Sequence, residues 1–181
     1  MSWRGEGFSA SSTDMRESES DLFSLAGGEL PLSNRGQLEL LYGMRERDAG
    51  LRTVVRGGSM APFVRDGDVV VVAPLRGVAP RVGEVVAVEL ARGATLAVHR
   101  VVRRSHRGVL VRGDNAAAAD GVVPPPSVLG RVVRVERGER RVRFGMGPER
   151  RVIAALSCLG LLRPLTGAAR RAYHALAYTR R

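Results

Sequence analysis

Residues 57–72 read Gly-Gly-Ser-Met-Ala-Pro-Phe-Val-Arg-Asp-Gly-Asp-Val-Val-Val-Val. The four valines at residues 69–72, directly after a Gly-Asp pair, predict a buried β-strand that follows a turn. The glycines before Ser59 leave the backbone N–H groups of an earlier turn uncovered, and Pro62 stiffens the chain behind it. The stretch therefore predicts a strand that is entered through a turn carrying a serine, which is either a simple turn residue or a nucleophile.

The composition restricts which base can activate that serine. The chain has no lysine, so all 29 residues of the Lys+Arg count are arginines. Arginine does not give up its proton in a protein, and a serine hydroxyl is a weak nucleophile until an adjacent base takes its proton. If Ser59 is chemically active, its base must be one of three histidines, namely His99, His106 and His174.

Valine-rich stretches alternate with turn residues from residue 51 to about residue 144. Strands are expected at residues 51–55, 69–73, 85–90, 96–102, 109–112, 128–135 and 140–144. The chain between His99 and Asp120 leaves no room for a crossover helix, which argues against an α/β sheet. We therefore expect a mainly β fold with the strand spacing of a barrel or sandwich.

His99 lies in the middle of the expected strand at residues 96–102. Alternation places His99 on one face of that strand with Ala97 and Val101. A histidine between small apolar residues is either a core residue or a base held in place. His106 falls in an arginine-rich hairpin tip and is expected to be solvated, and His174 lies far along the chain in the tail.

Two aspartates follow the next expected strand. Asp114 lies within a Gly-Asp-Asn sequence at residues 113–115, and Asp120 precedes Gly121. A histidine base works best when a carboxylate fixes its tautomer and stabilises the imidazolium. Both aspartates are therefore candidate partners of the base, although Gly-Asp-Asn is also ordinary turn chemistry.

The composition changes along the chain and suggests four segments. Residues 1–33 are rich in serine, glycine and acidic residues and read as a disordered acidic leader. A helix is expected at residues 34–50, with Asn34 and Gln37 as a capping box and a glycine cap near Gly50. The β domain spans residues 51–145, and a basic helical tail covers residues 146–181. In the tail, apolar residues recur at helical spacing (Val152, Ala155, Leu156 and Leu159), and a second helix is expected at residues 168–178.

Charge and hydropathy indicate which kinds of partner and which cellular compartment to expect. The net charge is +11, with −4 in residues 1–50 and +15 in residues 51–181. The positive charge of residues 51–181 could attract nucleic acid or an anionic membrane surface, or its arginines could simply be solvated. Nucleic-acid binding is not expected, because aromatic residues on which bases could stack are scarce. The single Cys158 excludes an internal disulfide, and neither a secretory signal nor a segment of ~20 apolar residues is present. We expect a cytoplasmic protein of unknown oligomeric state, with peripheral membrane contact through the tail as an open alternative.

The order of these motifs resembles a known domain. A Gly-Gly-Ser-Met-x-Pro turn, a Gly-Asp-Val-Val strand, a Gly-x-Val-Val strand at residues 83–86, a His-Arg-Val-Val strand at residues 99–102 and a Gly-Asp-Asn turn follow one another. This string resembles the peptidase domain of the S24/S26 superfamily, which is shared by type I signal peptidases and LexA-like self-cleaving repressors, over roughly residues 51–136. The resemblance implies a coiled antiparallel β-barrel and a serine endopeptidase that cleaves after small residues, often in an Ala-x-Ala pattern. It implies no metal and no organic cofactor.

The resemblance also implies roles for single residues. His99 stands where bacterial signal peptidases and LexA-like proteins carry a lysine, which is similar to the endoplasmic-reticulum, archaeal and SipW-like branch. Ser59 would be the nucleophile, His99 the base and Asp120 the third member, while Asp114 would mainly hold the turn. Gly57 stands where signal peptidases usually carry a serine, so the oxyanion hole would depend on backbone N–H groups, chiefly that of Ser59.

The sequence differs from these families in two further ways, so other functions remain open. The chain shows no N-terminal membrane helix of the signal-peptidase kind and no helix-turn-helix of the repressor kind. One alternative is self-processing at Ala26–Gly27 or Ala49–Gly50, which resemble the bond that LexA-like proteins cut. The other is a non-catalytic binding or maturation module that keeps the barrel.

Overall fold

The computed structural model describes residues 34–90 and 95–162 of the 181-residue chain. The acidic leader at residues 1–33, the second tail helix at residues 168–178 and His174 lie outside these residues. Within them, no helix combines the length and the apolar character needed to cross a bilayer. Membrane contact through the tail therefore stays a prediction.

The described residues form a mainly β structure, as expected. The strands are β1 (Leu51–Val54), β2 (Val69–Ala73), β3 (Val85–Leu90), β4 (Thr95–Ser105), β5 (Gly108–Arg112), β6 (Gly121–Val123), β7 (Val128–Arg137) and β8 (Arg140–Arg141). Two α-helices, α2 (Asn34–Arg47) and α3 (Arg150–Cys158), and one 3-10 turn, η1 (Pro125–Ser127), complete it.

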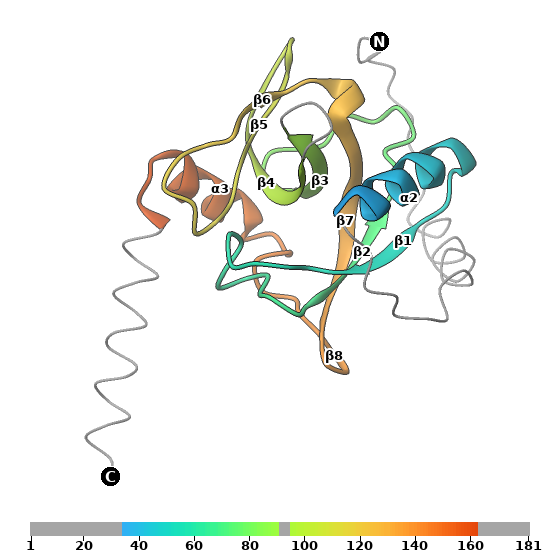
Figure 1. Ribbon diagram of the computed structural model, residues 1–181. Coiled ribbons are helices and arrows are strands. Elements are labelled where there is room, and N and C mark those ends of the chain that lie inside the picture. The colour runs from blue at the N-terminus through green and yellow to red at the C-terminus, as the bar shows by residue number, and fades with distance from the viewer. Residues whose placement is uncertain (1–33, 91–94, 163–181) are drawn as a thin grey trace.

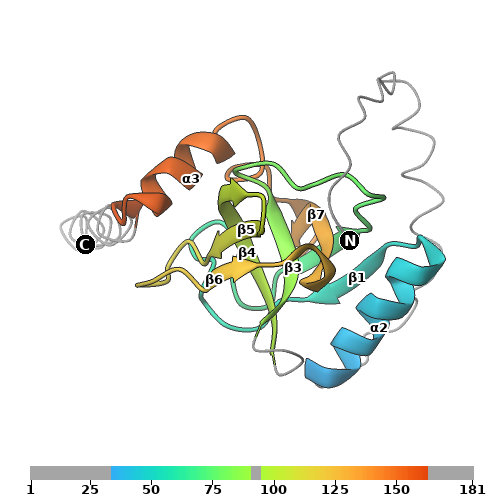
Figure 2. The ribbon, with the colours of Figure 1, turned by 90° about the horizontal axis from the view of Figure 1, so that it is seen from above.

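The strands form one antiparallel sheet with the order β1-β2-β7-β3-β4-β5-β6, and β8 extends β7. Helices α2 and α3 lie at opposite sides of this strongly curved sheet (Figures 1 and 2). No pairing joins β1 to β6 in the described part of the chain, so the hydrogen-bonded path is open. The mainly β, antiparallel architecture is confirmed, whereas closure into a barrel stays a prediction.

Alternating valines supply two separate cores, one on each face of the central strands. On β3, Val85 and Ala87 join the first core, while Val86 and Val88 join the second. The first core also takes the buried face of α2, and the second is closed by β5, β6 and the start of β7. Each fully buried valine stabilises the fold by about 1.5–3 kcal/mol relative to an exposed one, so the valine runs hold the sheet together.

Helix α2 occupies the expected residues but ends differently. The left-handed residue that terminates it is Asp48, with φ of 53°, and not the glycine that we predicted. The Ala49 N–H donates to the Met44 carbonyl at 3.1 Å, which closes the last turn as in a Schellman motif. Aspartate tolerates this conformation better than most residues, so Gly50 is not needed as the cap and directly precedes β1.

Two expectations for the C-terminal half are wrong in detail. The strand expected at residues 140–144 is only the two-residue β8, because the chain turns where the Met146 N–H donates to the Arg143 carbonyl. Helix α3 buries Ile153, Ala154 and Ser157. Val152 and the C-cap residue Leu159, which were expected to share a helical spacing with Ala155 and Leu156, are exposed. In addition, the short β6 was not predicted at all.

A buried carboxylate ties the segment after Ser59 to the sheet. Asp68 accepts hydrogen bonds from Arg137 Nε and Nη2, both at 2.8 Å, and from the Arg65 N–H at 2.8 Å. Arg137 Nη2 also donates to the Phe63 carbonyl at 3.1 Å. Burial alone would raise the pKa of Asp68, but these hydrogen bonds and the arginine charges outweigh it, so the pKa lies below its ordinary value.

This ion pair predicts how stability depends on pH. An unfolded aspartate titrates near pH 4 (about 3.9), and Asp68 keeps its charge to lower pH when folded. Its contribution is therefore fully present above about pH 4 and is lost as the pH falls through the lower folded-state pKa. We expect Asp68→Asn to lower the free energy of unfolding by about 2 kcal/mol at pH 7 and to flatten its fall below pH 4.

Chemical denaturation over a series of pH values measures both effects. Asp48→Asn is the matched control, because the Asp48–Arg76 pair is exposed at both side chains and should contribute less than about 1 kcal/mol. An unchanged pH slope in Asp68→Asn would contradict this assignment.

Candidate active site

The Ser59 turn is anchored on both sides by its neighbours. Gly57 has φ of 89°, a conformation that favours glycine, and its N–H donates to Asp66 Oδ1 at 2.8 Å. Met60 is buried in the first core, and the Val64 N–H donates to its carbonyl at 3.1 Å. Ser59 is therefore held exposed at the surface between a fixed glycine and a buried side chain.

Three of the four predicted side chains lie in one line of hydrogen bonds. The Ser59 Oγ and His99 Nε2 atoms are 3.0 Å apart, and His99 Nδ1 lies 2.7 Å from Asp120 Oδ2. An ionised carboxylate only accepts, so Nδ1–H donates to Asp120 and the neutral Nε2 accepts the Ser59 proton. The His99 side chain is only 9% exposed, whereas that of Asp120 is 22% exposed and Ser59 lies at the surface, so the imidazole is the most covered of the three groups.

The β5–β6 hairpin brings Asp120 to the histidine. Asp120 directly precedes β6, and its N–H donates to the Val111 carbonyl at 3.0 Å. Val111 itself pairs with Val101 of β4, two residues beyond His99. The carboxylate therefore reaches Nδ1 because a short strand returns beside β5, a pairing that the sequence alone did not reveal.

The Gly-Asp-Asn sequence packs directly against the Ser59 turn. The Asn115 N–H donates to the Ser59 carbonyl at 2.7 Å, and Asn115 Nδ2 donates to the Gly58 carbonyl at 3.3 Å. A Cβ atom on Gly113 would lie 2.7 Å from the Ser59 carbonyl oxygen and 3.2 Å from His99 Nε2. Only glycine lets this segment approach the Ser59–His99 contact so closely.

Asp114, the fourth predicted side chain, binds a different residue. Its two carboxylate oxygens accept from Arg100 Nε at 2.8 Å and from Arg100 Nη2 at 2.7 Å, and both side chains are 0% exposed. Arg100 Nη1 also donates to the carbonyls of Gly83 and Gly145, at 2.8 and 2.9 Å. Burial raises the pKa of Asp114, and the Arg100 hydrogen bonds and charge act against that rise.

Arg100 is the residue of this site that the sequence analysis missed. It follows His99 in β4 and points to the opposite face, where its guanidinium also lies 5.5 Å from the centre of the Phe63 ring. A usable signal was present, because strand alternation places Arg100 on the same face as Val98 and Val102. A charged residue among inward-facing valines needs a buried partner, and the nearby aspartates were the candidates.

The remaining candidates lie apart from this line. His106 sits exposed at the turn between β4 and β5, as expected. Across the described ranges, no group of three or more histidine, cysteine, aspartate or glutamate side chains is placed to hold a metal ion. The arrangement can pass a proton from a serine hydroxyl to an imidazole that a carboxylate orients, which is the chemistry of nucleophilic acyl transfer.

Comparison with known proteins gives one match. The family model described as Peptidase S24-like matches residues 26–133, which is more than half of the chain and includes all four predicted side chains. No curated protein and no solved structure matches the chain significantly.

The close approach at Gly113 predicts a large effect of one methyl group. Gly113→Ala would force the Ser59 turn away from His99, and we expect a loss of about 2 kcal/mol of stability together with a longer Oγ–Nε2 distance. Gly43→Ala is the control, because an added Cβ there meets nothing within 4 Å and alanine favours the helix. Thermal unfolding and a crystal structure of each variant test this; an unchanged Ser59–His99 distance in Gly113→Ala would be evidence against it.

The two aspartates should differ sharply in their effect on stability. Asp114→Ala leaves the Arg100 guanidinium buried without its partner, so we expect a loss of about 3–5 kcal/mol. Asp120→Ala removes a partly exposed contact and should cost about 1 kcal/mol or less. Denaturant unfolding of both variants measures the difference, and equal losses would contradict the separate roles.

Proposed function

We propose that this chain, which belongs to the Peptidase S24-like family, is a serine endopeptidase in which Ser59 is the nucleophile. His99 is the general base, and Asp120 orients it. The observation that carries the proposal is the pair of contacts at 3.0 Å and 2.7 Å that links the Ser59 hydroxyl, the imidazole and the carboxylate. The lack of lysine supports a histidine base, because arginine does not accept the proton.

In this mechanism the Ser59 oxygen attacks the carbonyl carbon of the scissile peptide bond while His99 Nε2 takes the hydroxyl proton. The resulting imidazolium is stabilised by Asp120 and then donates its proton to the leaving amine, which gives an acyl-serine and a free amine. A water molecule, deprotonated by the same imidazole, hydrolyses the ester and restores the Ser59 hydroxyl. Asp120 remains ionised throughout.

The oxyanion would be stabilised by backbone donors. In the part of the chain that the structure describes, the Ser59 N–H has no recorded acceptor, and the turn that carries it is exposed. Gly57 offers no hydroxyl to help, so the N–H of Ser59 is the chief donor in this proposal. Backbone donors held in place before the reaction stabilise developing charge efficiently, because they need no reorganisation.

The substrate proposed is a peptide or protein with small residues before the cleaved bond. This follows the resemblance to the histidine branch of the signal peptidases, together with its coiled barrel. The exposed position of Ser59 supports a substrate that arrives from solvent as an extended chain. An Ala-x-Ala peptide is therefore the first substrate to test.

Self-processing is the second candidate, because the family match also fits LexA-like proteins. The Ala49–Gly50 bond is a poor target in the folded chain. The Ala49 N–H closes helix α2, and Leu51 pairs with Val72 in the sheet, so this bond must leave both elements to be cut. The Ala26–Gly27 bond lies outside the described residues and remains the candidate.

Hydrolysis of an Ala-x-Ala peptide tests the proposed mechanism. We expect Ser59→Ala and His99→Ala to reduce kcat/KM by at least about 10⁴-fold, because either change removes the unit that transfers the proton. His106→Ala is the matched control and should keep full activity.

Two outcomes would overturn the proposal. Equal hydrolysis by the Ser59→Ala variant would exclude Ser59 as the nucleophile. Absence of any peptide hydrolysis, combined with a new N-terminus at Gly27 in the intact mass of aged protein but not in aged Ser59→Ala, would replace cleavage in trans by self-processing.

A further inference from the structure

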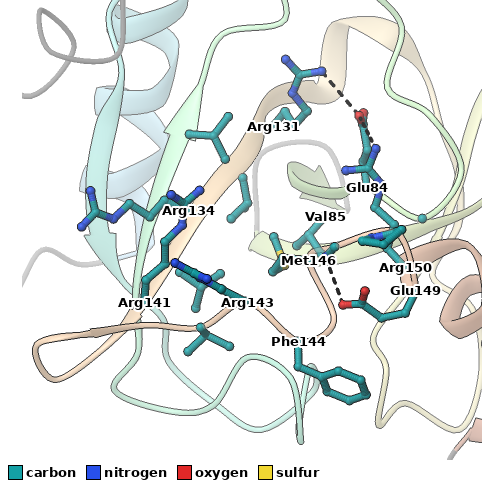
Figure 3. Close-up of a pocket in the computed structure, with 17 residues that line it drawn as sticks. Glu84, Val85, Arg131, Arg134, Arg141, Arg143, Phe144, Met146, Glu149 and Arg150 are labelled. Carbon is teal, nitrogen blue, oxygen red and sulfur yellow. Dashed lines mark hydrogen bonds and ion pairs between the residues drawn. The ribbon is translucent and has the colours of Figure 1, made fainter. Parts of the chain in front are cut away.

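A second feature of the molecule is a pocket that the proposed chemistry does not use. It has a volume of about 820 Å³ and lies between β7 and the segment that runs from β8 into α3. Its 17 lining residues include neither Ser59 nor His99 nor Asp120. Figure 3 shows Val85 and Met146 in its middle, with Arg134, Arg141 and Arg143 on one side.

The pocket carries more positive charge than its own acidic residues balance. Five arginines and two glutamates line it, and the arginines are Arg131, Arg134, Arg141, Arg143 and Arg150. Arg131 and Arg150 share one glutamate, Glu84, at 3.5 and 3.9 Å. Glu149, the other glutamate, accepts hydrogen bonds from the backbone of Gly145 and Gly147.

Arg141 and Arg143 are the two arginines of the pocket that pair with no acidic side chain in the described part of the chain. Both are exposed, and the structure records no acidic partner for either among residues 34–90 and 95–162. Arg134 already pairs with Glu136 at 2.8 Å. Each guanidinium is a planar fork of N–H donors that suits a carboxylate, and both groups lie on the same side of the pocket.

The centre of the pocket is apolar. Val85, Val132, Val135, Val142 and Met146 line it, and all of them belong to or pack against the first core. Phe144 stands at its edge with 69% of its surface exposed. Arginines around an apolar floor suit a peptide that carries acidic and large apolar side chains close together, better than they suit a small inorganic anion.

The chain itself contains such a peptide. Residues 17–25 read Glu-Ser-Glu-Ser-Asp-Leu-Phe-Ser-Leu, with three acids followed by three large apolar residues. Eight residues, 26–33, separate this segment from Asn34 at the start of α2, and the nine Cα–Cα steps from Leu25 to Asn34 can span about 30 Å when extended. A short flexible linker that spans the distance between two sites gives an effective concentration in the millimolar range, so a binding constant of that order is enough for occupancy. We propose that residues 17–25 bind this arginine pocket in the same molecule.

A fluorescent reporter in the full chain tests the proposal. Trp3 is the only tryptophan, so the Trp3→Phe, Phe23→Trp variant carries a single reporter inside the segment. We expect a blue-shifted emission at low salt that moves toward that of exposed tryptophan at about 0.5 M salt, as screening removes the ion pairs. Adding Arg141→Glu and Arg143→Glu should produce the red shift without salt.

Proteolysis gives an independent readout. A glutamate-specific protease should cut after Glu17 and Glu19 about fivefold faster in the Arg141→Glu, Arg143→Glu variant than in its parent, which is what the loss of two exposed ion pairs provides. Arg103→Glu with Arg104→Glu is the matched control. It makes the same charge change on exposed residues at the end of β4, outside the pocket, and should leave both readouts unchanged.

Charge reversal on the segment completes the test. Adding Glu19→Arg and Asp21→Arg to the Arg141→Glu, Arg143→Glu variant should restore the blue-shifted emission. The proposal is overturned by a reporter that is solvent-exposed at every salt concentration, by equal effects of the control pair, or by a lack of rescue. A red shift that appears on dilution would also overturn it, because the segment would then bind a second copy.

Discussion

The buried ion pair between Arg100 and Asp114 is the interaction on which the rest of the structure depends. Each partner adjoins a residue of the proposed site, since Arg100 follows His99 in β4 and Asp114 lies between Gly113 and Asn115. One bidentate contact therefore fixes the histidine strand relative to the segment that holds the Ser59 turn. Burying both charges costs several kcal/mol, which the bidentate contact and the two further hydrogen bonds from Arg100 to carbonyl groups offset together.

The two aspartates that follow β5 have different partners. Asp114 is buried and structural, whereas Asp120 is partly exposed and contacts the imidazole. This separation lets the carboxylate beside His99 remain solvated on one side, while the turn is held by an ion pair that water does not reach. The proposed site therefore combines a buried Arg100–Asp114 pair, which holds its backbone segments together, with an Asp120 carboxylate that stays partly exposed to water.

The absence of lysine affects more than the choice of base. Every positive charge in the chain is a guanidinium or an imidazole apart from the N-terminus, so its ion pairs can use two nitrogens of one planar group. Arg137 on Asp68 and Arg100 on Asp114 both use two nitrogens of one side chain. The same property leaves the pocket beside β7 and β8 with guanidinium groups that suit carboxylates, and residues 1–50 carry the opposite charge.

The sequence by itself determined the mainly β class, helix α2 and most strand positions, and it singled out Ser59, His99 and two aspartates as candidates for the site. These follow from local chemistry, because valine runs, turn glycines and the lack of lysine act over a few residues. The residues alone left both aspartates open and the family resemblance pointed to Asp120; the tertiary structure places Asp120 against His99, pairs Arg100 with Asp114, and decides which face α3 buries. Those outcomes depend on residues far apart in the chain, such as Gly83, Gly145 and Asp114 meeting around one guanidinium, and on a β6 strand too short to carry a pattern. Long-range pairing of this kind is set by how the whole sheet curves, which no local window of sequence contains.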